Sequence, residues 1–244
     1  MLFTLKKRKK RILGLIGGAA AFCLAVFSVM LFNLYRAHRV DPLPQSRLDA
    51  LDLSRTDKLM IVAHPDDEMI WGGAHLLEGG YLVLCITDGR NKTRTAEFEK
   101  AVTQSGNIPL ILEYPDKVNF MRDDWDSVRN GIETDIQSVI RLKDWSLIVT
   151  HNAAGEYGHQ HHKMTNDLTA EACSALNCTD VLYVFGKYYK AADLPAVQSS
   201  LPRISDEALR QKTALCSIYQ SQDSVMKKLC HMFPHENWTK YESQ

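Results

Sequence analysis

The sequence predicts an α/β fold in which a mainly parallel sheet carries helices on both faces, preceded by one N-terminal transmembrane helix. Two observations lead to this prediction. Short apolar runs rich in β-branched residues alternate with longer amphipathic segments, and this order is typical of parallel strands joined by right-handed helical crossovers. A long apolar run without charged residues comes before them, and its length suits a membrane-spanning helix.

The N-terminal region divides into a basic flank at 1–11 and an apolar run at 12–34. A transmembrane helix needs about 20 apolar residues, and this run meets that length. A cleaved signal peptide is the competing interpretation, but its apolar region is normally roughly 7 to 15 residues long. Six basic residues precede the run, against Arg36 and Arg39 after it. The positive-inside rule therefore predicts a single-pass protein with a cytoplasmic N-terminus and a domain on the exported side, whether periplasmic, extracytoplasmic or lumenal.

A polar linker at 35–56 leads into one expected globular domain at 57–244, a size that suits a single core. The formal net charge is zero, but without the six basic residues of the flank there are 23 basic against 29 acidic side chains, a net charge of −6. Nucleic acid is not an expected partner, since binding its phosphates requires a clustered basic surface. The five cysteines after the span leave disulfides and buried thiols open as alternatives.

The order of elements in the domain follows from length and hydrophobic period. The runs expected to be strands are short, continuous and apolar, as strands buried on both faces are, and they lie at 59–63, 81–87, 110–114, 146–151 and 181–186. The amphipathic segments expected to be helices lie at 67–77, 93–105, 126–142, 159–176 and 205–219. This is the doubly wound, Rossmann-like architecture, in which ligands bind at the carboxyl ends of strands.

Two polar clusters directly follow predicted strands. AHPDDE at 63–68 follows the first strand, and GEYGHQHH at 155–162 follows the fourth. Because both clusters lie at the same end of the sheet, their side chains can converge on one point. Two histidines and an acid with an open coordination position are typical of a catalytic zinc site. Taken alone, His-Pro-Asp-Asp is more often a turn with a solvated acidic tip, and the histidine pair is a similarly weak signal, so the prediction depends on their joint placement after two strands of one sheet.

Spacing within the clusters indicates their chemistry. His64 and Asp67 are three residues apart across a strand-to-helix turn, and His159 and His162 are three apart where a helix begins. Adjacent side chains at a turn point in different directions, so one acid can bind a metal while its neighbour takes a proton. Asp66 is then the general base for the attacking water and later the proton donor to the leaving amine.

These residues resemble the PIG-L/LmbE-like family of zinc-dependent de-N-acetylases, which share a Rossmann-like fold. The resemblance is carried by AHPDDE and GEYGHQHH, extends through ITDGRNKTRTAEF at 86–98, and ends near YQSQ at 219–222. The site residues that it implies are the metal ligands His64, Asp67 and His162, the general base Asp66, and His159, which stabilises the tetrahedral intermediate.

One position departs from the family pattern. The family often has Asp or Asn just before the last ligand histidine, where this sequence has His161. A carboxylate there could orient a neighbouring imidazole, so the departure bears on the charge state of His159 and on the pH optimum. We expect His161 on the surface, because consecutive helical residues diverge. Glu156 is a candidate acid to offset the positive helix end near His159.

Two further residues resemble positions at which the family contacts substrate. Arg94 offers a guanidinium to sugar hydroxyls or a phosphate, and the alternative is a surface ion pair with Glu97. Asp116 resembles a position near the sugar, and the alternative is a simple turn after Pro115. Glu68 either supports the site or is an acid favoured by the helix dipole.

The resemblance implies a metal-dependent hydrolase that removes acetyl from an N-acetylated amino sugar, of the N-acetylglucosaminyl type. Zn²⁺ is the expected cofactor and Fe²⁺ a second candidate, since affinity order does not fix the physiological metal. The membrane helix suggests a membrane-associated or surface glycan as substrate, such as a lipid-linked one. The alternatives are a related amidase acting on a thiol or antibiotic-like sugar conjugate, and a catalytically inactive, tethered glycan-binding protein.

Overall fold

The central sheet of the computed structural model is built from apolar strands that are buried on both faces. Its parallel strands are β1 (Lys58–Val62), β2 (Tyr81–Thr87), β3 (Ile108–Tyr114), β6 (Leu147–Thr150) and β7 (Leu182–Val184), and the short β8 (Thr239–Lys240) pairs antiparallel with β7. The strand order is β3-β2-β1-β6-β7-β8. The structure describes residues 2–242, with side chains from Gly17 onward.

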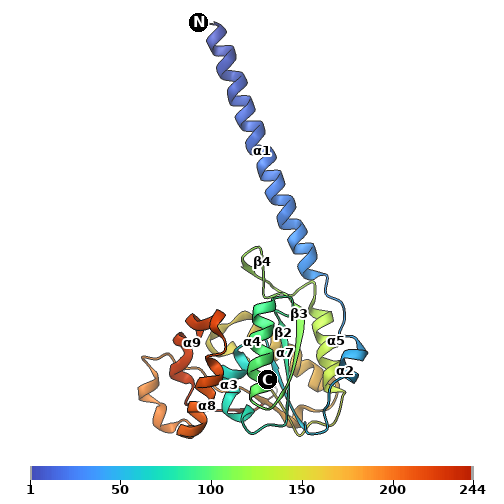
Figure 1. Ribbon diagram of the computed structural model, residues 1–244, viewed down its shortest axis with the longest axis vertical. Coiled ribbons are helices and arrows are strands. Elements are labelled where there is room, and N and C mark those ends of the chain that lie inside the picture. The colour runs from blue at the N-terminus through green and yellow to red at the C-terminus, as the bar shows by residue number, and fades with distance from the viewer. Residues whose placement is uncertain (1, 243–244) are drawn as a thin grey trace. The chain divides into compact units, whose positions relative to one another are not determined.

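Helices cover both faces of this sheet. They are α2 (Gln45–Asp49), α3 (Asp67–Leu76), α4 (Lys92–Gln104), α5 (Arg129–Ile140), α6 (Gly155–Gly158), α7 (Gln160–Ala175), α8 (Asp206–Cys216) and α9 (Asp223–Leu229). Alternate residues of β1 serve the two layers: Leu59 and Ile61 pack with α5 and α7, whereas Met60 and Val62 pack with α3, α4 and α8. Figure 1 shows α3 and α8 on one side of this unit and α5 on the other. The predicted α/β fold is confirmed.

The side of the sheet on which the chain adds successive strands changes at β1. From β1 the chain continues to β2 and β3 on one side, and then returns to place β6 on the other side of β1. A switch of this kind opens a crevice at the carboxyl ends of the two central strands, where such sheets bind ligands. The first polar residues beyond these ends are His64 after β1 and His151 after β6.

The predicted strands and helices all form, with bounds that differ by a few residues. For example, α5 begins at Arg129 and not at residue 126, after a turn that follows Trp125, whose φ is 58°. α8 begins after Ser205, whose hydroxyl oxygen accepts a hydrogen bond from the Ala208 N–H at 3.1 Å. β8 and α9 were not predicted, since neither is long enough to show a period. All six cysteines are free thiols.

Short 3₁₀ helices complete the loops of the C-terminal half. They span Thr179–Val181, Leu194–Ala196, Gln198–Ser200, Gln220–Gln222 and Cys230–Met232. The last two flank α9, whose Met226 and Leu229 are buried against the α3 and α8 layer. This segment therefore belongs to the same core as the main sheet.

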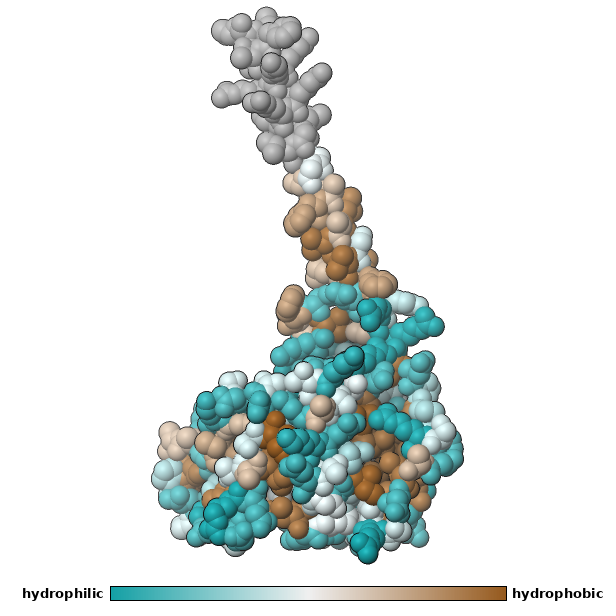
Figure 2. Space-filling model, in the orientation of Figure 1, coloured by the Kyte–Doolittle hydropathy of each residue, from teal (hydrophilic) through white to brown (hydrophobic). Residues whose placement is uncertain are grey.

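A second unit consists of α1 (Leu2–His38) and the hairpin of β4 (Lys117–Val118) and β5 (Met121–Arg122). Within α1, Gly17–His38 is long and apolar enough to cross a membrane, a property that signal sequences share. The described part of this helix presents a mostly apolar surface (Figure 2). Side chains of the basic flank lie outside the described residues, so the orientation in a membrane stays a prediction.

Candidate metal centre

The first half of the site is the turn between β1 and α3. The backbone N–H of His64 donates to Asp67 Oδ2 at 2.9 Å, and His64 Nδ1 lies 3.1 Å from the same oxygen. Asp66, between them, has φ 116°, a conformation that costs a non-glycine residue about 1–3 kcal/mol and clusters at functional sites. The sharp turn brings His64 and Asp67 together and directs Asp66 elsewhere.

The second half follows β6, the neighbouring strand. Glu156 and His162 are both buried, and Glu156 Oε2 lies 2.5 Å from His162 Nδ1. The other oxygen of Glu156 accepts from the Asn152 N–H at 2.9 Å. Burial raises the pKa of a carboxyl, but the two imidazoles of His151 and His162 outweigh it and bring the pKa of Glu156 to about 2. Glu156 is therefore a carboxylate that fixes the orientation of His162.

Asp67 joins the two halves. Its Oδ1 lies 3.2 Å from His162 Nε2, a buried nitrogen that has no hydrogen-bond partner. Since Nδ1 of His162 donates to Glu156, Nε2 is the nitrogen that faces the Asp67 carboxylate. Although burial opposes it, the carboxylates of Asp67 and Glu156 raise the pKa of His162 to about 10, so a positive charge at Nε2, either a proton or a metal ion, is stabilised here. A carboxylate behind the imidazole and a second carboxylate before it form the usual surroundings of a metal-binding histidine, so this donor set fits a metal ion.

Among the residues that the structure describes, three groups of side chains place potential ligand atoms within 4.8 Å of one another, and His162 takes part in two of them. The groups are His64 with His159 and His162, His64 with Asp116 and His161, and Asp67 with His151 and His162. The predicted ligands His64, Asp67 and His162 are thus divided between two overlapping groups. They are connected through Asp67, which contacts both histidines.

His151, the residue directly after β6, is a part of the site that the sequence did not identify. Its Nε2 accepts the Ala63 N–H at 3.1 Å, and its Nδ1 lies 3.0 Å from Glu156 Oε2. Both ring nitrogens are therefore engaged, and the tautomer is fixed with the proton on Nδ1. This pattern assigns His151 to positioning Glu156. His151 directly follows β6, the strand that neighbours β1, and this position in the sequence could have identified it.

Asp66 is paired with Arg94 on α4. Arg94 Nη1 lies 3.4 Å from Asp66 Oδ2, Nη2 donates to the Pro65 carbonyl at 2.5 Å, and Nε lies 3.4 Å from Asp88. Burial raises the pKa of Asp66 to about 7 against the opposing guanidinium. The alternative of an ion pair between Arg94 and Glu97 is wrong, because Glu97 accepts from the backbone N–H and the hydroxyl of Ser221.

Glu68 holds Asp66 from the other side. It is fully buried, accepts the Asp66 N–H at 3.0 Å, and receives a hydrogen bond from the Tyr219 hydroxyl. Burial raises the pKa of Glu68 to about 8, although the Tyr219 hydrogen bond opposes this. Glu68 therefore supports the strained turn of Asp66 from within the core, and it is not a surface acid at a helix end.

His161 is buried, and the expectation of a surface position is wrong. Its ring stacks on Trp125 with centroids 4.0 Å apart, and its Nδ1 lies 3.1 Å from His64 Nε2 and 3.5 Å from Asp116 Oδ1. Consecutive residues of α7 do diverge, but Trp125 covers the face that His161 takes. Asp116 also lies 3.3 Å from His64 Nε2, which places it at the site.

His159 precedes α7 and lies against the predicted ligands. Its ring centroid is 4.7 Å from that of His64 and 4.3 Å from that of His162. The expected contact between His159 and Glu156 is replaced by the contact of Glu156 with His162. All seven predicted site residues therefore contact at least one other member of the set, whereas their individual roles stay predictions.

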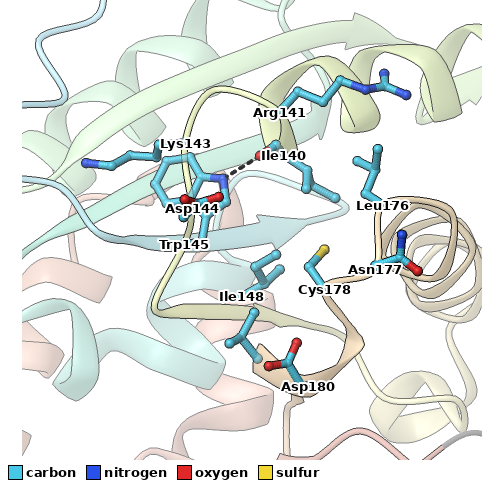
Figure 3. Close-up of a pocket in the computed structure, with 11 residues that line it drawn as sticks. Ile140, Arg141, Lys143, Asp144, Trp145, Ile148, Leu176, Asn177, Cys178 and Asp180 are labelled. Carbon is cyan, nitrogen blue, oxygen red and sulfur yellow. Dashed lines mark hydrogen bonds between the residues drawn. The ribbon is translucent and has the colours of Figure 1, made fainter.

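A hollow of about 530 Å³ at the other end of the sheet shares no residue with this site. It lies where α5 and α7 end and where β6 and β7 begin, and is lined by Ile140, Trp145, Cys178 and Asp180 among others. Figure 3 shows the Trp145 indole donating to the Ile140 carbonyl at its rim, at 3.0 Å. The hollow lies at the amino ends of the strands, opposite the edge where such sheets bind ligands.

Comparisons with known proteins agree with the position of the site. Residues 59–173 match the family model described as PIG-L, GlcNAc-PI de-N-acetylase. The match begins in β1 and ends in α7, so it contains both halves of the candidate centre. The chain is also 30% identical over 200 residues to the uncharacterized protein L374 of Acanthamoeba polyphaga mimivirus, covering 75% of this chain and 79% of that protein.

Proposed function

The chain belongs to the PIG-L family of de-N-acetylases, and on that basis we propose that it is a zinc-dependent hydrolase that removes acetyl from an N-acetylated amino sugar. One observation carries the proposal: the buried Nε2 of His162 faces Asp67 Oδ1 at 3.2 Å while Glu156 holds the other side of the ring. The nitrogen and the oxygen are both donor types that zinc binds, and they lie side by side in a buried site.

His64, Asp67 and His162 would hold the metal, with Fe²⁺ as an alternative to Zn²⁺. When bound, the ion supplies a Lewis-acid charge that makes water nucleophilic near neutral pH and polarises the amide carbonyl. A cation here would also lower the pKa of the adjacent Asp66, because an opposite charge favours the ionised carboxyl. Asp66 would then be available as a base.

The chain's own residues would carry the proton and position the substrate. Asp66 would take the proton from the attacking water and pass it to the leaving amine, while Arg94 and Glu68 keep its carboxyl in place. His159, against the rings of His64 and His162, would donate to the developing oxyanion. Arg94 and Asp116 would contact the sugar or its phosphate.

The substrate and topology belong to the same proposal. We place the N-terminus in the cytoplasm, Gly17–His38 across the membrane, and the hydrolase on the exported side. A tethered enzyme meets substrates at the membrane, so a lipid-linked N-acetylamino sugar is the proposed class. The inactive binding protein is disfavoured because a binding site has no need of a strained, buried acid at Asp66.

The test is metal content and acetate release by the full-length chain in lipid nanodiscs. The substrates are N-acetylglucosamine and a lipid-linked N-acetylamino sugar, and the matched variants are Asp66→Asn and Asp144→Asn, the latter in the hollow at the opposite edge. We expect bound metal in all three proteins and acetate from wild type and Asp144→Asn alone. A metal-free, inactive wild type would instead favour the binding protein, and acetate from neither sugar despite bound metal would favour a different amide substrate.

A further inference from the structure

The hairpin of β4 and β5 turns through two residues with positive φ, and neither of them is glycine. Lys117 pairs with Arg122 and Val118 with Met121, so the loop is Asn119-Phe120. Both have positive φ, 50° and 68°, as a type I′ turn requires. Glycine is strongly preferred at the second position, and a bulky residue with positive φ is a conformational outlier. Phe120 thus imposes a cost on folding.

The side chains at this tip gain nothing from the protein's own core. Phe120 is 99% exposed and Met121 is 73% exposed. Outside α1, these two and Tyr157 are the exposed large hydrophobic residues of the described chain. Isolated surface apolar residues are normal, but two adjacent ones at a strained tip suggest contact with something outside the protein.

The tip is tied to the candidate membrane span. Asn33 Nδ2 donates to Asn119 Oδ1 at 3.1 Å, and Asn119 Nδ2 donates to the Met30 carbonyl at 2.9 Å. His38 Nε2 lies 2.7 Å from Asp123 Oδ2, just beyond the hairpin. Asn33 is a polar residue within an apolar helix, and such residues are normally satisfied by a partner at the same depth.

The depth of the tip follows from these contacts. Tyr35, 62% exposed, followed by Arg36 and Arg39, has the composition of the membrane–water interface. Met30 and Asn33 precede Tyr35 by five and two residues, which corresponds to roughly 3–8 Å along a helix at 1.5 Å per residue. Asn119 is therefore held on the membrane side of Tyr35, at a depth typical of interfacial segments.

We propose that the β4–β5 hairpin is a second membrane contact, which inserts Phe120 and Met121 into the lipid beside α1. The proposal rests on the membrane anchoring proposed above and not on the hydrolysis. Lys117 follows Asp116 of the candidate centre directly in the chain, so a lipid-held hairpin would be joined to the site through one peptide bond. The headgroup sugar of a lipid-linked substrate lies at the membrane surface that the hairpin would contact.

The experiment places tryptophan at the tip of the full-length chain in vesicles whose acyl chains carry bromine, which quenches tryptophan on contact. The variants are Phe120→Trp and Met121→Trp, with Tyr35→Trp in α1 as the inserted control and Asp180→Trp, at an exposed turn of the globular unit, as the aqueous control. We expect quenching of both tip variants above the wild-type background, comparable to that of Tyr35→Trp. Tip variants quenched no more than Asp180→Trp would overturn the proposal.

Two further readouts separate this proposal from the proposed activity. Acetate release from water-soluble N-acetylglucosamine by the same preparations reports on the hydrolase alone. Phe120→Gly creates the preferred Asn-Gly turn and removes the aromatic ring, so we expect it to lose acetate release from a lipid-embedded substrate while release from the soluble sugar is unchanged. Equal retention of both activities would mean that the hairpin does not serve substrate access.

Discussion

Two buried polar clusters in the globular unit are similar in composition and opposite in organisation. One surrounds Asp67 at the carboxyl ends of β1 and β6, and the other joins Lys212 of α8 to Glu236 in the C-terminal segment. Both place carboxylates and basic side chains where water cannot reach them. Burial of charge is costly in each case unless the charges are paired and hydrogen-bonded.

The Lys212 cluster satisfies its donors and acceptors internally. Lys212 Nζ donates to the Ile70 carbonyl at 2.8 Å, to the Phe233 carbonyl at 3.3 Å and to Glu236 at 2.7 Å. Glu236 also accepts the backbone N–H groups of Ala74 and His75, at 2.7 and 3.1 Å. This cluster attaches the C-terminal segment to α3, and its charged groups direct their hydrogen bonds to each other and to the backbone and not to a ligand.

The Asp67 cluster leaves His162 Nε2 without a hydrogen bond and holds Asp66 at positive φ. Stability would favour a cluster that closes on itself as the other does. The comparison therefore teaches that burial and charge alone do not mark a site. The distinguishing feature is a buried imidazole nitrogen that makes no hydrogen bond and faces a carboxylate oxygen.

The largest effect is expected where the open cluster loses its proton carrier. Asp66→Asn keeps the shape of the side chain and tolerates positive φ, but it cannot take a proton. We expect the rate of acetate release to fall by about 10²–10⁴-fold, with bound metal and melting temperature retained. Loss of metal together with activity would instead assign Asp66 to the metal-binding set.

Breaking the closed cluster should change stability and not metal binding. Lys212→Met leaves the Glu236 carboxylate buried without its cation, a change that costs about 3–5 kcal/mol of unfolding free energy, measurable by denaturant titration. Metal content per folded molecule should be unchanged. Recovery of part of the loss in Lys212→Met with Glu236→Gln would assign the cost to the stranded charge, and a loss below about 1 kcal/mol would contradict a buried pair.

The closed cluster also predicts a pH window for stability. Burial raises the pKa of Glu236, but Lys212 and the hydrogen bond from His75 outweigh this and lower it from 4.5 to about 2. The unfolded chain therefore takes up the proton first. The contribution, on the order of 3 kcal/mol, is present above pH 4.5 and is lost as pH falls toward 2. The difference in unfolding free energy between wild type and Glu236→Gln should shrink over that window, and a constant difference would refute it.

The smallest effect is expected for the carboxylate behind His162. Glu156→Gln retains an acceptor for the imidazole N–H but removes the negative charge. Outer-shell partners of this kind typically change metal affinity by about 10–100-fold, which competition with a chelator measures. Glu113→Gln, an exposed acid on β3, is the control. An unchanged affinity would show that His162 does not need this charge.

Local sequence was sufficient for much of the site. AHPDDE after an apolar run predicted the turn that brings His64 to Asp67, and the short spacing makes that contact a local one. The same applies to the strands, whose continuous apolar runs required burial on both faces. The contacts that the sequence missed are distant along the chain, as between Asp66 and Arg94 or between Glu68 and Tyr219.

The sequence by itself determined the order of strands and helices, the apolar N-terminal helix and the two clusters, because hydrophobic period and turn chemistry act over a few residues. Only the tertiary structure decided which nitrogen of each histidine is engaged. It placed Trp125 over His161 and buried a residue expected at the surface. It also placed His151 in hydrogen-bond contact with Glu156, the acid considered for His159. These outcomes depend on how neighbouring strands and helices pack, and no local pattern encodes the distance between side chains that meet across a sheet.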